Sequence, residues 1–288
     1  MKTKLIIFLA VIFMSFTIIS DKPAYLIYTK DGKQADYKIM LEKLKDADIV
    51  FIGELHNNPI SHWMELEITK DLFSKNKEGV TLGAEMFESD NQLIIDEYLN
   101  DYISKKSFKD EARLWPNYKT DYKPLMEFAK KNKLKFIATN IPRRYASVMF
   151  KKGQEGIDKL SDEAKKYIAP IPFLYDPKLK CYADMIEMGK KMGHTGDNFP
   201  KSQAIKDATM AHFILKNMEK GKIFIHYNGS YHSDNFEGIV WHIKHVNKKM
   251  KIMTVSTVSQ NDISKLEKDN FNKADYIIAV PESMTTTH

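Results

Sequence analysis

The sequence predicts an α/β protein in which helices flank a mostly parallel β-sheet. Short apolar runs rich in Val, Ile or Phe alternate along the chain with amphipathic stretches. Buried parallel strands contain such runs, whereas helices carry apolar residues at every third or fourth position. Regular alternation of the two is typical of a parallel sheet covered by helices. The 288-residue chain is 43% hydrophobic and 28% charged, a composition that supports one large globular domain.

The expected strands begin with an edge segment at residues 25–29, ahead of a turn at Asp31-Gly32. Six further apolar runs are predicted to form the sheet, at residues 48–52, 80–84, 134–138, 223–225, 252–255 and 276–280. Between these runs, residues 63–73 and 205–218 show the clearest helical periodicity.

Residues 150–200 break this alternation. They contain Pro170, Pro172, Pro177 and Pro200, and no run in them resembles a strand. We therefore expect a helical insertion that caps the sheet, within a single domain over residues 21–283. The last residues, 284–288, are expected to be disordered.

The first twenty residues have the pattern of a secretory signal peptide, because Lys2 and Lys4 precede an apolar run that starts at Leu5. The alternative is an uncleaved membrane anchor, since residues 18–20 form a weak cleavage site. The run is short for a spanning helix, which favours cleavage near Ser20. We therefore expect an exported protein, periplasmic or extracellular, that associates with a membrane only if this segment is retained.

The charge of the chain argues against a nucleic-acid partner, and its cysteine content excludes an internal disulfide. Loss of Lys2 and Lys4 would lower the formal net charge of +6 by two, and the remaining excess is spread along the chain as lysine. Such a modest and dispersed charge predicts no nucleic-acid partner. Cys181 is the sole cysteine, so no internal disulfide can form.

Residues with catalytic and ligating chemistry follow four of the predicted strands. They are Gly53-Glu54-Leu55-His56, Glu85, Arg143 and Gly229-Ser230-Tyr231-His232. These side chains are expected to converge, because ligands bind beyond the carboxyl ends of the strands in open α/β sheets. Two histidines with carboxylates suit Zn, Mn, Co or Fe, so His56, Glu85 and His232 are predicted metal ligands. Glu54 would then act as general base.

Three further residues near these motifs have more than one interpretation. Arg143 can hold an anion at a helix start, or form a salt bridge that orients the site. Asp207 lies on a predicted helix, where it can support a site histidine or face solvent. His62 follows His56 by six residues and is predicted to lie on the wrong helical face to join it.

A series of short motifs, each present once, occurs along the chain between about residue 37 and residue 255. They are Gly-Glu-Leu-His-Asn-Asn-Pro-Ile-Ser-His from Gly53, Glu85-Met86-Phe87, Trp115-Pro116-Asn117-Tyr118, Asn140-Ile141-Pro142-Arg143, the run from Gln203 to Ala211, Gly229-Ser230-Tyr231-His232 and Gly238-Ile239-Val240. In this order they resemble the ChaN-like haem-binding uptake proteins of the Tiki superfamily, which is also related to erythromycin esterases.

The resemblance implies haem as the ligand and iron uptake or haem handling as the function. It also implies a homodimer, since a member of the family binds haem pairwise at a dimer interface through a tyrosine. Tyr182 and His194 in the insertion are the candidate haem ligands here. The wider superfamily implies an alternative, a metal-dependent protease or esterase in which Arg143 stabilises the oxyanion. A catalytically silent interaction module is a third hypothesis.

Overall fold

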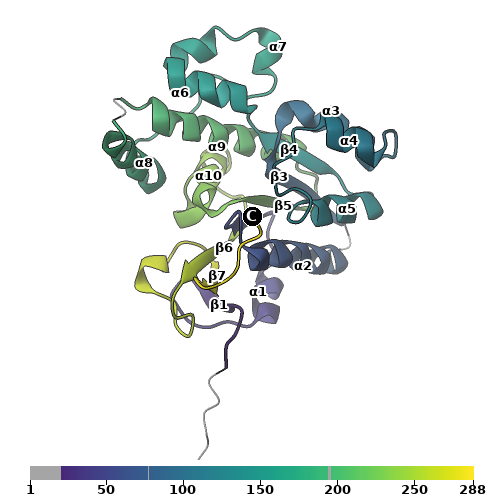
Figure 1. The fold of residues 1–288 in the computed structure, drawn as a ribbon, viewed down its shortest axis with the longest axis vertical. Helices are drawn as coiled ribbons and strands as arrows, with labels where there is room; N and C mark the ends of the chain where they lie inside the picture. The colour runs from purple at the N-terminus through teal and green to yellow at the C-terminus, as the bar shows by residue number, and fades with distance from the viewer. Residues whose placement is uncertain (1–20, 77, 194–195) are drawn as a thin grey trace, which may run out of the picture.

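The fold is built around one twisted sheet of seven strands (Figure 1). The structure is a computed structural model that describes residues 21–76, 78–193 and 196–288. The predicted signal peptide, residues 1–20, lies outside the described residues. The strands are β1 (Leu26–Thr29), β2 (Ile49–Glu54), β3 (Val80–Glu88), β4 (Phe136–Asn140), β5 (Ile223–Gly229), β6 (Ile252–Gln260) and β7 (Tyr276–Pro281).

The order of the strands in the sheet is β1-β7-β6-β2-β5-β3-β4. Every neighbouring pair is parallel except β1 and β7, which run antiparallel at one edge. The structure therefore confirms the predicted fold class and the predicted edge strand. Because β2, β5 and β3 are adjacent, their carboxyl ends, which carry the histidine and glutamate motifs, lie side by side.

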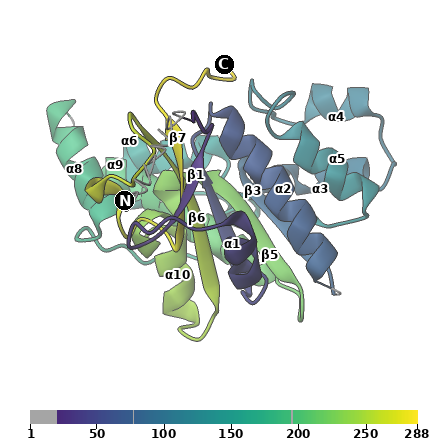
Figure 2. The same cartoon turned by 90° about the horizontal axis from the view of Figure 1, so that it is seen from below.

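Helices cover both faces of the sheet (Figure 2). They are α1 (Tyr37–Leu44), α2 (Pro59–Lys75), α3 (Gln92–Leu99), α4 (Lys105–Glu111), α5 (Lys123–Lys131), α6 (Arg143–Asp158), α7 (Asp162–Lys165), α8 (Lys180–Lys191), α9 (Asn198–Asn217) and α10 (Ile239–Val246). Side chains of β2 alternate between the two cores, as strand geometry requires. Val50 and Ile52 pack with α1 to α5, while Ile49 and Phe51 pack with α9 and α10.

The predicted helical insertion corresponds to α6, α7, α8 and the start of α9, between β4 and β5. No strand occurs in the part of residues 150–200 that the structure describes. Helix α9 packs against both α6 and α8 and also against β4, so it joins the insertion to the sheet.

Helix α2 begins immediately after the first motif because its start is capped. The side-chain oxygen of Asn58 accepts hydrogen bonds from the backbone amides of Ile60 and Ser61 at 3.0 and 3.1 Å. Pro59 occupies the first helical position, where the missing amide hydrogen costs nothing. The helix then turns His62 and Glu65 inward, and both are buried. His62 was expected on a helical face that does not reach His56, whereas its Nε2 lies 3.1 Å from the carbonyl oxygen of His56.

The carboxyl-terminal residues return to the site. Disorder was predicted for residues 284–288, whereas the structure places Thr287 against the first motif. Its amide donates to the carbonyl of Asn57, and its hydroxyl donates to Asp121, both at 2.9 Å. Across the described residues, no helix combines the length and apolar character that crossing a membrane requires.

Candidate functional site

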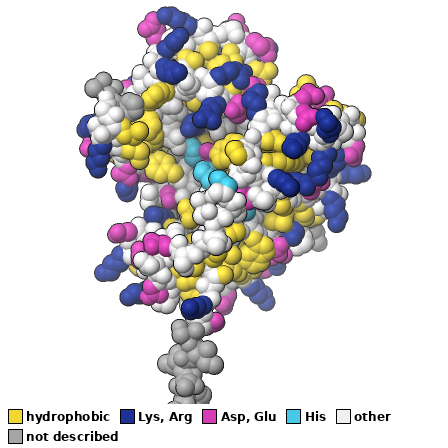
Figure 3. All heavy atoms as spheres, in the orientation of Figure 1, with side chains coloured by type: hydrophobic (Ala, Val, Ile, Leu, Met, Phe, Trp, Pro, Cys, Tyr) yellow, Lys and Arg dark blue, Asp and Glu magenta, His cyan; other side chains and the backbone are white. Residues whose placement is uncertain are grey.

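A hollow of about 600 Å³ opens at the carboxyl ends of β2, β3 and β5. It is lined by Glu54, Leu55, His56, Asn57, Glu85, Gln203, Lys206, Gly229, Ser230, Tyr231, His232 and His288. Figure 3 shows histidine side chains in this hollow, with apolar side chains on both sides of it. The register of the sheet pairs Gly53 with Asn228 and Glu54 with Gly229, which sets the two Gly-x-x-His motifs next to each other.

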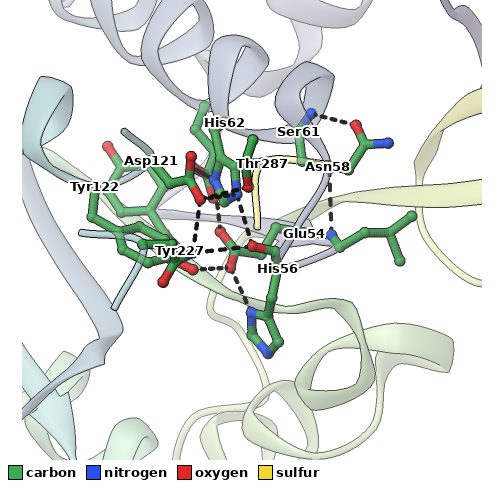
Figure 4. A network of polar contacts seen from close by, with 12 residues as sticks. Glu54, His56, Asn58, Ser61, His62, Asp121, Tyr122, Tyr227 and Thr287 are labelled. Carbon is green, nitrogen blue, oxygen red and sulfur yellow. Dashed lines mark hydrogen bonds and ion pairs between the residues drawn. The ribbon is translucent and has the colours of Figure 1, made fainter. Parts of the chain in front are cut away.

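The imidazole of His56 is fixed on one side and open on the other. Its Nδ1 lies 2.6 Å from Oε1 of Glu54, which also accepts a hydrogen bond of 2.7 Å from the Tyr122 hydroxyl (Figure 4). The ring meets Trp115 edge-on, with centroids 5.1 Å apart. The His56 side chain remains 44% exposed, and Nε2 has no hydrogen-bond partner among the described residues. Nε2 is therefore available to a ligand in the hollow.

The charge state of His56 reflects this mixed environment. Burial alone would lower the pKa of His56, but the hydrogen bond to Glu54 and the negative charge of Glu85 raise it. The bond to Glu54 also selects the tautomer with hydrogen on Nδ1 and makes Nε2 more basic.

Gly229 provides the space that the His56 ring occupies. A Cβ at this position would lie 2.8 Å from Cε1 of His56 and 2.9 Å from Nε2. Real Cβ atoms do not approach other atoms so closely, so the ring sits directly against the glycine. The glycine of the second motif therefore positions the histidine of the first.

His232 lies deeper and is held from both sides by carboxylates. Its Nε2 is 3.2 Å from Oε1 of Glu85, and its Nδ1 is hydrogen-bonded to Asp207. Glu85 also accepts a hydrogen bond of 2.8 Å from the amide of Gly229. The hydroxyl of Tyr182 donates to the second oxygen of Asp207 at 2.8 Å.

These contacts make His232 an imidazolium. Burial alone would lower the pKa of His232, but the charges of Glu85 and Asp207 outweigh it and raise the pKa to about 10. Burial would likewise raise the pKa of Glu85, yet the charge and hydrogen bond of His232 lower it to about 2. A metal ion bound by His232 would have to displace a proton that two carboxylates hold in place.

We expect the unfolding free energy to fall as the pH rises from about 6.5 towards 10. The native pKa of His232 is raised, so its stabilising charge is complete below the unfolded pKa and disappears as the native group loses its proton. Asp207→Asn removes one partner and should flatten this dependence. Denaturant titrations of both proteins at pH 6, 8 and 10 measure the difference, and parallel curves would contradict the assignment.

A second cluster lies beneath His56, on the side facing α2. Nδ1 of His62 is 3.2 Å from Oε2 of Glu65 and 3.4 Å from Oε2 of Glu54. Burial raises the pKa of both glutamates to about 8, and the negative charge of Glu65 adds to the effect at Glu54. Asp121 completes the cluster 3.4 Å from Nε2 of His62.

The sequence did not point to Glu65 or Asp121, and His62 was considered but not expected to join His56. The signal on α2 was the position of Ser61 and Glu65 on its apolar face, since they fall in line with the apolar Ile68 at spacings of four and three residues and all three are buried. Asp121 carried no comparable signal, because it lies between α4 and α5 and not at the end of a strand.

The remaining predicted site residues occupy different surroundings. Arg143 is exposed at the start of α6 and does not line the hollow. Its neighbour Arg144 pairs with Asp90 at 2.6 Å. Tyr182 is fully buried, and burial together with the charge of Asp207 raises its pKa well above the usual value. His194 lies outside the described residues.

Fold and site together define an α/β protein with a histidine- and glutamate-lined hollow at the carboxyl ends of three adjacent parallel strands. A family model described as "Haem-binding uptake, Tiki superfamily, ChaN" matches residues 40–243. The chain belongs to this family. The matched residues include both Gly-x-x-His motifs and Glu85.

Solved structures share this fold. ChaN of Campylobacter jejuni, in a structure described as showing cofacial haem binding, superposes with a TM-score of 0.64 at 17% identity, over 88% of this chain and 96% of that one. A Bacillus cereus protein gives a TM-score of 0.51 at 12% identity, over 85% and 90% of the two chains.

One curated relative also matches. RETICULATA-RELATED 5, a chloroplastic protein of Arabidopsis thaliana, is 30% identical over 141 residues, which is 47% of this chain. The match spans 19% of the length of that protein.

Proposed function

We propose that this chain is an exported haem-binding protein that serves haem uptake or handling. The observation that carries the proposal is membership of a haem-binding uptake family over residues 40–243, the part of the chain that builds most of the hollow. The basic and apolar segment of residues 1–20 supports export. Two features of the hollow, its free imidazole nitrogen and its apolar sides, fit haem.

The residues of the hollow suit an iron porphyrin. Haem iron needs an axial ligand with an available lone pair, and the macrocycle needs apolar surface. Nε2 of His56 meets the first need, and its Nδ1–Glu54 bond is the support that metal-binding histidines usually have. Trp115 beside His56 and the partly exposed Tyr231 meet the second. When bound, haem would supply an iron centre that the protein carries or transfers.

His56 is the ligand that we assign to the iron. Tyr182, a candidate from the sequence, would have to bind as phenolate, but its hydroxyl is buried and donates to Asp207. His194 remains a proposed alternative in the insertion. Substitution distinguishes His56 from His194 as the ligand, because the variant of the true ligand should lose haem and the other variant should keep it.

A haemin titration followed at the Soret band tests the proposal. We expect saturable binding by the wild-type protein and at least a 100-fold weaker affinity for His56→Ala, which corresponds to about 2.7 kcal/mol. His245→Ala is the matched control, because His245 is exposed on the last turn of α10 and does not line the hollow. Failure of the wild-type protein to bind haemin would contradict the proposed function. If His194→Ala loses haemin affinity while His56→Ala keeps it, the iron ligand is His194 in the insertion.

A metal-dependent hydrolase is a second candidate, favoured by the convergence of His56, Glu85 and His232 in one hollow. In that scheme these three residues hold the metal, Glu54 acts as base and Arg143 stabilises the oxyanion. The position of Arg143 outside the hollow weighs against this scheme. Metal content and ester hydrolysis, compared between the wild-type protein and the His56→Ala, His232→Ala double variant, test it; equal values for both would contradict it.

A further inference from the structure

The cluster beneath His56 concentrates acidic side chains in the protein interior. Glu54, Glu65 and Asp121 are at most 2% exposed. Among the described residues, none of the three has a Lys or Arg partner, and histidines are their only ion-pair partners. Buried charges are normally paired or bound to metal, because the interior solvates them poorly. Ionised carboxylates in this cluster would therefore have no Lys or Arg counter-charge.

The hydrogen bonds of His62 identify which of its nitrogens carries hydrogen. Nε2 lies 3.1 Å from the carbonyl oxygen of His56, which can only accept, so Nε2 bears the hydrogen. A neutral His62 then points the lone pair of Nδ1 at carboxylate oxygens of Glu54 and Glu65. Three electron-rich atoms facing one another repel unless a proton or a metal ion lies between them.

Two carboxylate oxygens of the cluster have no hydrogen-bond partner. Oε1 of Glu54 is used by His56 and Tyr122, but its Oε2 is buried and unpartnered. Oε1 of Glu65 is likewise buried and unpartnered. Buried acceptors are almost always satisfied in folded proteins, so two such oxygens in one cluster indicate either a proton shared between the two glutamates or a bound cation.

We propose that Glu54, His62 and Glu65 bind a divalent transition-metal cation. Each offers one ligand atom, and these atoms all lie within 4.8 Å of one another. The 3.2 and 3.4 Å separations from Nδ1 of His62 match the spacing of about 3.4 Å between ligands at 2.1 Å in a tetrahedral zinc site. One imidazole and two carboxylates suit Zn²⁺ or Mn²⁺.

The surroundings orient the ligands of this site. Asp121 lies 3.4 Å from Nε2 of His62 and is itself held by the amide of Asn117 at 2.7 Å. A carboxylate behind the far nitrogen of a histidine is a common support for a metal ligand. Glu54 takes part in this site through its Oε2, while its Oε1 is hydrogen-bonded to His56 (Figure 4). The site is thus distinct from the haem hollow and does not depend on haem binding, but it shares one carboxylate with it.

Titration of Zn²⁺ and of Mn²⁺ into the purified, chelator-treated and haem-free protein tests the proposal by calorimetry. We expect one equivalent of one or both ions to bind to the wild-type protein, and Glu65→Gln to weaken that affinity at least tenfold. His56→Ala is the comparison variant: it should keep the metal while losing haem. Absence of stoichiometric binding by the wild-type protein would overturn the proposal. Equal affinity in Glu65→Gln, or loss in His56→Ala as large as in Glu65→Gln, would overturn it as well.

Thermal unfolding separates metal binding from a purely structural role. Without metal, Glu65→Gln should be at least as stable as the wild-type protein, because an uncharged amide of the same shape replaces a carboxyl whose ionised form burial disfavours. Added metal should raise the melting temperature of the wild-type protein only, since a ligand that binds the native state stabilises it. A variant that is less stable without metal and equally stabilised by metal would overturn the proposal.

Discussion

Replacement of His232 by glutamine is expected to lower the free energy of unfolding by about 3–5 kcal/mol, the usual cost of breaking a buried ion pair from one side. Glu85 and Asp207 would remain in the interior, 6% and 1% exposed, without their shared counter-charge. Denaturant-induced unfolding at pH 7 measures the loss.

The control for this prediction is the double variant in which Glu85 is also replaced, His232→Gln with Glu85→Gln. It removes one of the two stranded carboxylates and should recover part of the stability. His245→Gln, on an exposed helix position, should change stability by less than about 0.5 kcal/mol. A His232→Gln protein as stable as the wild type would show that the imidazolium is not held as described.

Gly229→Ala is expected to weaken haem binding about 100-fold, or roughly 2.7 kcal/mol, while the protein stays folded. Gly229 has φ −52° and ψ 134°, which alanine adopts without strain. The new Cβ would instead clash with the His56 ring, because it would lie 2.8 Å from Cε1. The half-exposed ring can rotate away from it, which removes Nε2 from its place in the hollow. Soret titration measures the affinity, and circular dichroism reports the fold.

A double-mutant cycle shows whether the effect passes through His56. If Gly229→Ala acts by displacing the ring, it should cause no further loss of affinity in a His56→Ala background. Additive losses in the double variant would mean that the glycine contacts haem directly or shapes another part of the hollow.

The sheet is largely predictable from the sequence because its strands are short, apolar and separated by helical periodicity. The structure confirms each predicted strand, and it extends β3 to Glu88 and β5 to Gly229. The convergence of His56, Glu85 and His232 was also predictable, since it follows from parallel strands that end at one edge.

The interior partners of these residues were not predictable in the same way. The inward turn of His62 depends on where Asn58 caps α2, because a shift of one residue rotates a helical side chain by about 100°. Tyr182 meets Asp207 through the packing of α8 on α9, a contact between segments with no shared pattern. The return of Thr287 to Asp121 joins residues 166 positions apart in sequence, which no local signal marks.

Imidazole rescue of His56→Gly tests the central claim most directly. This variant leaves a space beside Gly229 and Glu54, where free imidazole can replace the missing ring. We expect haem to be lost from the variant, and imidazole to restore a wild-type absorption spectrum to haem that co-elutes with the protein on gel filtration. A His56→Gly protein that keeps the wild-type haem spectrum without imidazole would contradict the assignment of His56 as the iron ligand.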